Sequence, residues 1–418
     1  MSLTEMTSMS DTLKIDGSRL WDSLMQMAEI GATKKGGCNR QALTDEDKQG
    51  RDLFARWCES AGCTVRVDEM GNIFARRAGI DNTLAPVIAG SHLDTQPTGG
   101  KFDGVYGVLA ALEVIRSLND ADIKTRHPVE AVVWTNEEGA RFSPAMIGSG
   151  VWAGEFDINY GHSRTDKQGC TLGEELQRIG YLGKNPCKTF EVKAAFEVHI
   201  EQGPILEKEE LQIGVLTGVQ GMRWYDLIIE GQACHAGPTP MEMRRDPFMA
   251  LHQIISKLYE LIAGQAPWGR ITFGDISVEP GSRNTVPQKL TLSIDLRHPD
   301  EEVLDNIDQE MRAIVEDECQ LLNLIGSVNN EWLSPSVKFD PDCIAAVQKA
   351  SDLLKYSNKQ MVSGAGHDSV YISRVAPTSM IFIPCEDGLS HNEAENVKKE
   401  DIEAGCNVLL HAILNRAN

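Results

Sequence analysis

Short apolar stretches alternate with amphipathic ones along the first half of this chain, and this alternation constrains its fold more than any other feature. Apolar runs typical of buried strands end at Ser91, Thr135 and Ile200, and residues 105–118 have helical apolar spacing. Strands that alternate with helices form a parallel sheet covered by helices on both faces. We therefore predict an α/β fold with a mainly parallel sheet. In such sheets, functional residues gather where strands end and loops begin.

The pattern changes at residue 216. Between 216 and 332 the elements follow the order βαββαβ, which is typical of a four-stranded antiparallel sheet with two helices on one face. The first pattern then returns, with a helix over 342–354, a strand over 378–383 and a final helix over 400–414. We therefore predict a ferredoxin-like α+β domain at 216–332, inserted into an α/β domain formed by 11–215 and 333–418. Residues 1–10 are expected to be a disordered leader.

Composition narrows the class of protein. A chain of 418 residues with 41% hydrophobic content is long enough for two packed domains. Its net charge of -21 repels phosphate backbones, so nucleic acid is a poor candidate partner. We find no apolar run near the ~20 residues that span a bilayer, and no signal-peptide pattern. The ten cysteines include no C-x-x-C pair, which is typical of a reducing compartment. We expect a cytoplasmic protein without a membrane or nucleic-acid partner.

Polar side chains follow the predicted strands. His92 and Asp94 lie two residues apart at a strand end and therefore on one side of the chain. A metal-bound imidazole usually donates its second N–H to a carboxylate, so His92 is a candidate ligand and Asp94 its orienting partner. The alternative is a structural hydrogen bond between the two side chains.

Three carboxylates follow the same logic. Asp103 lies in a glycine-rich loop over 98–104, where glycines allow sharp turns that bring a carboxylate inward. Its alternative is an N-cap role for the helix that follows. Glu137 and Glu138 are adjacent and repel each other when partly buried, which raises one pKa unless a cation is present. One can then bind metal while the other moves protons. Their alternative is a solvated turn.

Two further histidines, His199 and His391, each follow an apolar stretch. With them the set contains three histidines, one glutamate and one shared aspartate. Such a set suits two Zn²⁺-like ions a few ångströms apart. Mn²⁺, Co²⁺ or Ni²⁺ also accept mixed imidazole and carboxylate ligands. The sequence therefore predicts two divalent ions, with zinc first.

The order His-x-Asp, Asp-Gly, Glu-Glu, a further ligand and a C-terminal histidine resembles the M20 family of dinuclear metallo-amidohydrolases and peptidases. The motifs at 136–142, 199–203 and 364–368 resemble its hydantoinase/carbamoylase branch. That branch contains N-carbamoyl-L-amino-acid hydrolases, β-ureidopropionases and allantoate amidohydrolases. His199 stands where many peptidases of the family have an acidic residue, which favours this branch.

The resemblance implies a division of roles among the candidate residues. One ion would be held by His92, Asp103 and His199. The second would be held by Asp103 again with Glu138 and His391, and Glu137 would be the general base and acid. The inserted domain would act as a lid and as the interface of a homodimer.

The resemblance also implies a substrate side. His235 would reach across the dimer interface to stabilise the tetrahedral oxyanion, although by itself it is typical of a surface histidine. Arg297 would grip the substrate carboxylate with its bidentate guanidinium, the alternative being a surface ion pair with Asp295 or Asp300. The remaining contacts would come from Gln202, Asn284, Gly366 and His367.

We therefore expect a metal-dependent hydrolase of the ureido C–N bond. Its substrate would be an N-carbamoyl-L-amino acid or N-carbamoyl-β-alanine, and its products the amino acid, ammonia and carbon dioxide. The alternatives are an allantoate amidohydrolase, an M20 peptidase or N-acyl-amino-acid hydrolase, and an inactive binding protein. Retention of all five ligand candidates and of Glu137 argues against the last.

Overall fold

The computed structural model describes residues 12–418, so the leader expected at 1–10 lies outside the described residues. The chain forms two compact units. The first runs up to Thr217 and resumes at Phe339, and the second is Gly218–Lys338. The insert expected from the sequence is 216–332.

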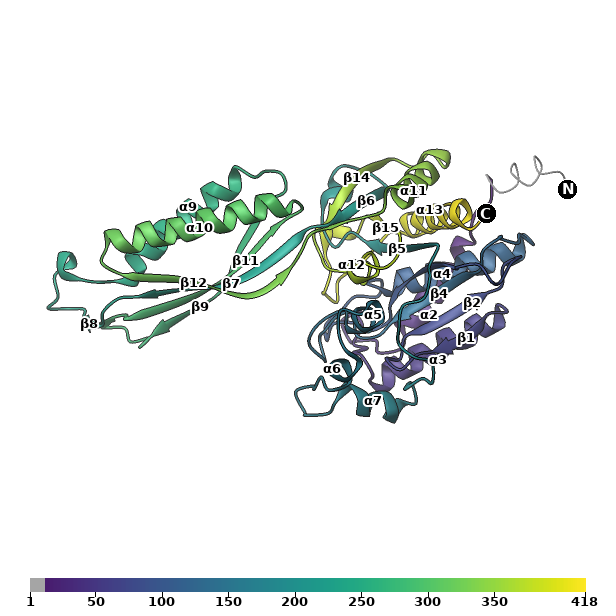
Figure 1. Ribbon diagram of the computed structural model, residues 1–418, viewed down its shortest axis with the longest axis horizontal. Helices are drawn as coiled ribbons and strands as arrows, with labels where there is room; N and C mark the ends of the chain where they lie inside the picture. The colour runs from purple at the N-terminus through teal and green to yellow at the C-terminus, as the bar shows by residue number, and fades with distance from the viewer. Residues whose placement is uncertain (1–11) are drawn as a thin grey trace. The chain divides into compact units, whose positions relative to one another are not determined.

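The first unit contains a nine-stranded sheet with the order β1-β2-β4-β3-β5-β15-β6-β13, and β14 pairs with β6. Its central strands β4, β3, β5 and β15 are parallel to one another, whereas β1, β2, β6 and β13 pair in antiparallel fashion (Figure 1). The mainly parallel sheet expected from the sequence therefore describes the centre, and the antiparallel flanks are an addition. The strands are β1 (Thr64–Val67), β2 (Ile73–Arg77), β3 (Val87–His92), β4 (Val129–Trp134), β5 (Ala194–Ile200), β6 (Ile213–Val219), β13 (Val337–Lys338), β14 (Asn358–Ser363) and β15 (Thr378–Ile383).

Both faces of this sheet are buried, because side chains of successive strand residues point to opposite sides. In β3, Val87 and Ala89 join the main core, which also contains side chains from α2, α3, α4, α11 and α13. Ile88 joins a smaller cluster with Trp134 and Trp152. The helices are α2 (Gly17–Ala28), α3 (Asp45–Ser60), α4 (Val105–Asp120), α5 (Ile147–Ala153), α6 (Ile158–His162), α7 (Leu172–Ile179), α8 (Ile205–Lys208), α11 (Pro341–Leu353), α12 (Ser369–Ile372) and α13 (Lys399–Ala417), with the 3-10 helix η2 (Glu386–Gly388).

Helix boundaries in this unit follow local chemistry. Asp16 accepts hydrogen bonds from the backbone N–H groups of Ser18 and Arg19 and so caps α2. Thr44 caps α3, whose first turn is acidic and complements the helix dipole. The helices expected at 105–118, 342–354 and 400–414 are present within a few residues. The short helices α5 to α8 were not predicted, because they have too few turns for an apolar period to be recognised.

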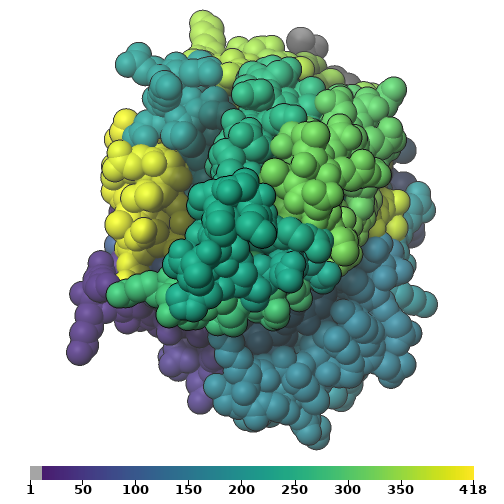
Figure 2. Space-filling view, turned by 90° about the vertical axis from the view of Figure 1, so that its left-hand side faces the viewer, coloured from purple at the N-terminus to yellow at the C-terminus, as the bar shows by residue number. Residues whose placement is uncertain are grey.

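The second unit has the βαββαβ order expected from the sequence, in a four-stranded antiparallel sheet with the order β12-β7-β11-β9. Helices α9 and α10 lie side by side on one face of this sheet, in teal and green (Figures 1 and 2). A two-stranded ribbon joins β8 to β10. The elements are β7 (Gly221–Glu230), β8 (Cys234–His235), η1 (Met241–Met243), α9 (Pro247–Ala263), β9 (Arg270–Glu279), β10 (Thr285–Val286), β11 (Lys289–His298), α10 (Glu301–Leu321) and β12 (Ile325–Ser334).

Candidate metal centre

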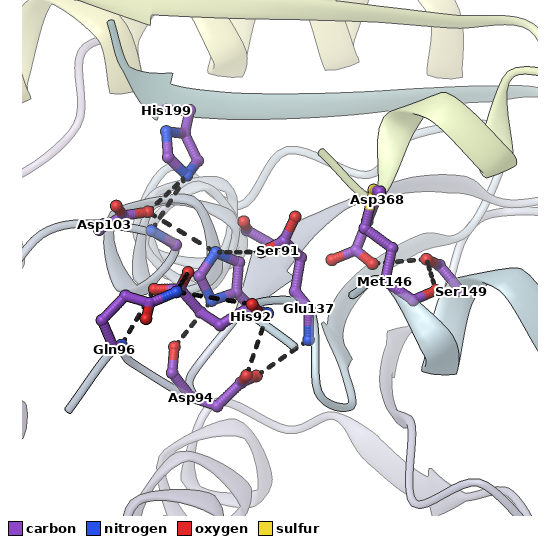
Figure 3. A network of polar contacts seen from close by, with 12 residues as sticks. Ser91, His92, Asp94, Gln96, Asp103, Glu137, Met146, Ser149, His199 and Asp368 are labelled. Atoms are coloured by element: carbon purple, nitrogen blue, oxygen red, sulfur yellow. Dashed lines mark hydrogen bonds and ion pairs between the residues drawn. The ribbon is translucent and has the colours of Figure 1, made fainter. Parts of the chain in front are cut away.

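The ends of the parallel strands bring distant side chains together. His92 is the last residue of β3, His199 lies near the end of β5, and Glu137 and Glu138 follow β4. His391 comes from the loop after β15. Because β4, β3, β5 and β15 are neighbours and parallel, their carboxyl ends meet at one edge of the sheet. Figure 3 shows His92, Glu137 and His199 converging near Asp103.

Asp103 lies between the histidines. Its Oδ1 is 3.2 Å from His199 Nε2 and 3.7 Å from His92 Nε2. Its Oδ2 is 3.5 Å from His391 Nε2, which in turn is 3.3 Å from Glu138 Oε2. Two groups of possible ligands therefore share this one carboxylate.

The donor set fits a divalent cation. In each group, one ligand atom per residue lies within 4.8 Å of the others. Imidazole nitrogens with carboxylate oxygens are ligands that Zn²⁺ accepts. Oδ1 of Asp103 faces His92 and His199, whereas Oδ2 faces His391, so each oxygen is available to a different ligand group. The clusters can therefore hold a divalent cation.

The pKa values of the side chains in the metal-free protein also indicate a site for positive charge. Burial lowers the pKa of His199, but its hydrogen bond to Asp103 and the charges of Asp103 and Glu197 together outweigh this and raise the pKa to about 9. The hydrogen bond to Glu138 raises the pKa of His391 to about 9. Burial raises the pKa of Asp103, but its interactions with His199, His92 and Ser390 together hold the pKa below its usual range. The site thus keeps positive charge between its carboxylates, and a cation can take the place of those protons.

Asp94 plays a different part from the one expected. His92 Nδ1 contacts the backbone carbonyl of Asp94 at 2.8 Å, rather than its carboxylate. The carboxylate instead accepts the backbone N–H of Glu137 at 3.3 Å and that of Glu138 at 3.2 Å. Asp94 therefore orients His92 through its main chain and fixes the Glu-Glu turn through its side chain. The assignment of its carboxylate to His92 is corrected accordingly.

The loop that carries Asp103 is tightly held. Gly104 has φ +68°, and a Cβ there would lie 2.3 Å from the His92 ring, so only glycine fits. The buried Glu395 accepts the N–H of Phe102 at 2.9 Å and that of Asp103 at 3.1 Å. Ser390 donates to Asp103 Oδ2 at 2.6 Å.

Glu137 is buried beside the cluster and is in neither group of possible ligands. Its Oε2 lies 3.5 Å from His92 Nε2. Burial raises the pKa of Glu137 well above its usual range, and the charges of Asp368 and Glu138 raise it further. A carboxylate with a raised pKa accepts a proton readily, which suits a general base.

Four residues around the site were missed in the sequence. Gln96 donates from its backbone and its side chain to Glu138, at 3.1 and 2.8 Å. Gln96 could have been found in the sequence because it lies just after the His-x-Asp motif, and Ser390 because it directly precedes His391. Asp368 is the last residue of the motif at 364–368, next to His367, which was also a usable signal, whereas Glu395 reaches the site only through the fold.

Three of the six predicted substrate residues lie at or next to this cluster. Gln202 donates to Asp103 Oδ2 at 2.9 Å. The buried ring of His367 lies 4.7 Å from that of His199, and its Nε2 is 3.0 Å from Ser363 Oγ. Gly366 is the residue before it. Burial lowers the pKa of His367 well below its usual range, so this ring is neutral.

The other three predicted substrate residues belong to the second unit. His235 pairs with Thr285 in the β8–β10 ribbon, and Ala236 donates its N–H to the carbonyl of Asn284 at 2.9 Å. His235 and Asn284 are both exposed and lie in one local structure. Arg297 pairs with Asp295 at 2.7 Å, which is the ion pair weighed as its alternative role. Their contacts with substrate remain predictions.

None of the described helices is both long and apolar enough to cross a membrane.

Comparisons with known proteins agree with the motifs. An N-carbamoyl-L-amino-acid amidohydrolase of Rhizobium meliloti is 46% identical over 99% of this chain and 99% of its own length. An allantoate amidohydrolase of Bacillus subtilis is 33% identical, over 93% of this chain and 95% of its own. A crystal structure of an amidase of the hydantoinase/carbamoylase family from Burkholderia multivorans is 54% identical. It superposes with a TM-score of 0.94, covering 97% of this chain and 99% of that one.

The family model of "Peptidase family M20/M25/M40" matches residues 88–415, a span that contains every ligand candidate. The family resemblance expected from the sequence is confirmed by this match. The chain belongs to peptidase family M20/M25/M40.

Proposed function

We propose that this chain is a metal-dependent amidohydrolase that cleaves the ureido C–N bond of N-carbamoyl-L-amino acids or N-carbamoyl-β-alanine. The products would be the amino acid, ammonia and carbon dioxide. The observation that carries the proposal is the buried Glu137 beside two ligand groups that share Asp103. The names of its relatives supply the substrate class.

Two divalent ions per chain would occupy the ligand groups, with Zn²⁺ first and Mn²⁺, Co²⁺ or Ni²⁺ as alternatives. The first group is His92, Asp103 and His199, and the second is Asp103, Glu138 and His391. When bound, such ions polarise the substrate carbonyl and lower the pKa of a water molecule to about 7.

Glu137 would move the protons. Its carboxylate takes a proton from the attacking water and delivers it to the departing nitrogen, a shuttle worth ~10²–10⁴ in rate. Asp94 supports this by holding the backbone N–H groups of Glu137 and Glu138. The base therefore stays in place while the adjacent Glu138 serves as a ligand.

The second unit would supply the substrate contacts. His235 donates to the tetrahedral oxyanion, and losing one such donor typically costs ~10²–10³ in turnover. Arg297 exchanges its ion pair with Asp295 for the substrate carboxylate, which it binds bidentately. Asn284, from the same ribbon as His235, adds a polar contact.

A homodimer formed through the second unit completes this proposal. Strand β9 is at the edge of its sheet and has unpaired backbone groups on one side. Large apolar side chains are exposed on β9 and α9: Phe248 (43%), Met249 (44%), Tyr259 (54%) and Ile276 (45%). An edge strand beside apolar side chains suits pairing with a second copy of the chain.

Allantoate is the second candidate substrate, because it also carries ureido and carboxylate groups and a relative is named for it. A dipeptide or N-acyl amino acid is a third, from the wider family. The histidine at position 199 is the sequence feature that argues against the third.

Ammonia release from metal-loaded protein separates these candidates. The panel contains N-carbamoyl-L-amino acids, N-carbamoyl-β-alanine, allantoate and dipeptides, and the Glu137→Gln protein is the control. Release from an N-carbamoyl compound by wild type alone supports the proposal. If the protein cleaves a dipeptide and releases no ammonia from any ureido compound, its function is that of a peptidase instead.

A further inference from the structure

Asp368 is a buried carboxylate with one unused oxygen beside the proposed base. The residue is 0% exposed and directly precedes α12. Its Oδ1 accepts a hydrogen bond from Ser149 Oγ at 2.5 Å. Its Oδ2 is buried and has no hydrogen-bond partner within residues 12–418. Figure 3 shows this carboxylate pointing toward the side chain of Glu137.

Asp368 is held rigidly in this orientation. The next residue, Ser369, donates its N–H and hydroxyl to Glu197 Oε2 at 3.3 and 2.7 Å. Glu197 Oε1 accepts from Ser91 on β3 at 2.7 Å. Ser149 therefore anchors one oxygen while the backbone is fixed to the central strands, so the free oxygen is a preorganised acceptor.

A buried acceptor without a donor is costly, so this oxygen indicates a donor that arrives with a ligand. Burial and the charge of Glu197 raise the pKa of Asp368 well above its usual range, so without a ligand this carboxyl holds a proton readily. A donor N–H that arrives with a ligand favours the ionised form and can replace that proton. The missing partner is therefore an uncharged or positive N–H group that reaches Glu137.

The arrangement matches the dipole of a ureido group. Its carbonyl oxygen is negative and is attracted to the histidine and cation side of Glu137. Its NH₂ group is positive at the hydrogens and faces the opposite way. A carboxylate on that far side, where Figure 3 shows Asp368, complements NH₂. A formyl or acetyl group has no N–H to offer there.

We propose that Asp368 Oδ2 accepts a hydrogen bond from the carbamoyl NH₂ of the substrate and makes the site select carbamoyl over acyl groups. This inference rests on the proposed ureido hydrolysis. A site built to bind an N–H discriminates against an analogue that lacks it, because its own acceptor is then left unpaired.

The test compares two substrates in one protein. The first is the N-carbamoyl amino acid that wild type hydrolyses fastest, and the second is its N-formyl analogue. The quantity is the ratio of their kcat/KM values in wild type, Asp368→Leu and Asp368→Asn. Leucine has a similar shape and no acceptor, and Ser149 keeps the carbonyl of Met146 at 3.1 Å as a partner. Asp342→Leu removes the same charge from an exposed position of the same unit and is the matched control.

The ratio is expected to fall about 10- to 100-fold in Asp368→Leu, as for loss of one hydrogen bond to a charged group. The ratio should fall less in Asp368→Asn, because the amide carbonyl can face the substrate when the amide NH₂ group turns to Ser149. Asp342→Leu should keep the wild-type ratio. If leucine prevents folding, Asp368→Ala takes its place with the same expected fall.

A second readout needs no turnover. Calorimetric binding of both compounds to Glu137→Gln protein, with and without Asp368→Leu, should show weaker binding of the carbamoyl compound only. Equal losses for both compounds would overturn the inference, as would an asparagine variant as impaired as leucine. Failure of wild type to release ammonia from any ureido compound would instead refute the proposed function and is seen before any variant is made.

Discussion

Glu395 holds the loop that carries Asp103, so replacing it by alanine should weaken cation binding. The side chain accepts two backbone N–H groups, those of Phe102 and Asp103, and comes from the segment that also carries His391. Both bonds end on Oε1 of Glu395, so alanine removes their shared acceptor and leaves two buried donors unpaired. The carboxylate shared by the two ligand groups then loses its fixed position.

The expected loss follows from these two bonds. Each is worth about 1–1.5 kcal/mol when a buried donor loses its partner, so the binding conformation loses about 2–3 kcal/mol. Affinity falls with the population of that conformation, which gives about a 30- to 150-fold higher Kd. This agrees with the ~10- to 100-fold cost of removing groups that orient metal ligands.

Competition with a chromophoric chelator measures the Kd, and elemental analysis gives the metal content. Glu393→Ala is the matched control, because Glu393 lies in the same segment but pairs with the exposed Lys35, 3.5 Å away. The control should bind metal like wild type. Wild-type affinity in Glu395→Ala, or an equal loss in Glu393→Ala, would refute the reasoning.

Three further outcomes are expected. Glu137→Gln should lower kcat by at least ~10² while the metal content stays unchanged. A variant with wild-type kcat would show that Glu137 is not the general base. Arg297→Lys should raise KM about 10- to 100-fold because lysine cannot bind a carboxylate bidentately, and an unchanged KM would exclude the carboxylate contact. In chelator-treated protein, the pKa of His199 and of His391 is raised to about 9, so between about pH 6.5 and 9 the folded state holds protons that the unfolded state has lost. The stability that these two imidazoles contribute is therefore complete at about pH 6.5 and is lost toward pH 9, and a melting temperature that stays level or rises over this range would contradict the assignment.

Local sequence patterns predicted most residues of the candidate site. His92 is the last residue of β3, and Glu137 and Glu138 follow β4; both strands are buried along their whole length, because both faces of the sheet are covered. Parallel neighbours bring such ends together, so the sequence predicts their convergence. The βαββαβ order of the second unit was equally visible, because its strands and its two long helices have clear periods.

What the sequence could not provide are contacts between distant segments. Glu395 and Asp368 act through backbone N–H groups and a serine far away in the chain, and no periodicity encodes such pairs. The two functions of Asp94 illustrate the same limit, since spacing places both its carbonyl and its carboxylate near His92. Only the folded Glu-Glu turn decides which one contacts the ring.

Anomalous diffraction from crystals of metal-loaded protein tests the central claim most directly. The account expects two peaks per chain that share Asp103, one beside His92 and His199 and the other beside Glu138 and His391. Absence of peaks at these positions in metal-replete protein would contradict it, and so would a single peak among Glu197, His199 and His367, a third possible ligand group within residues 12–418.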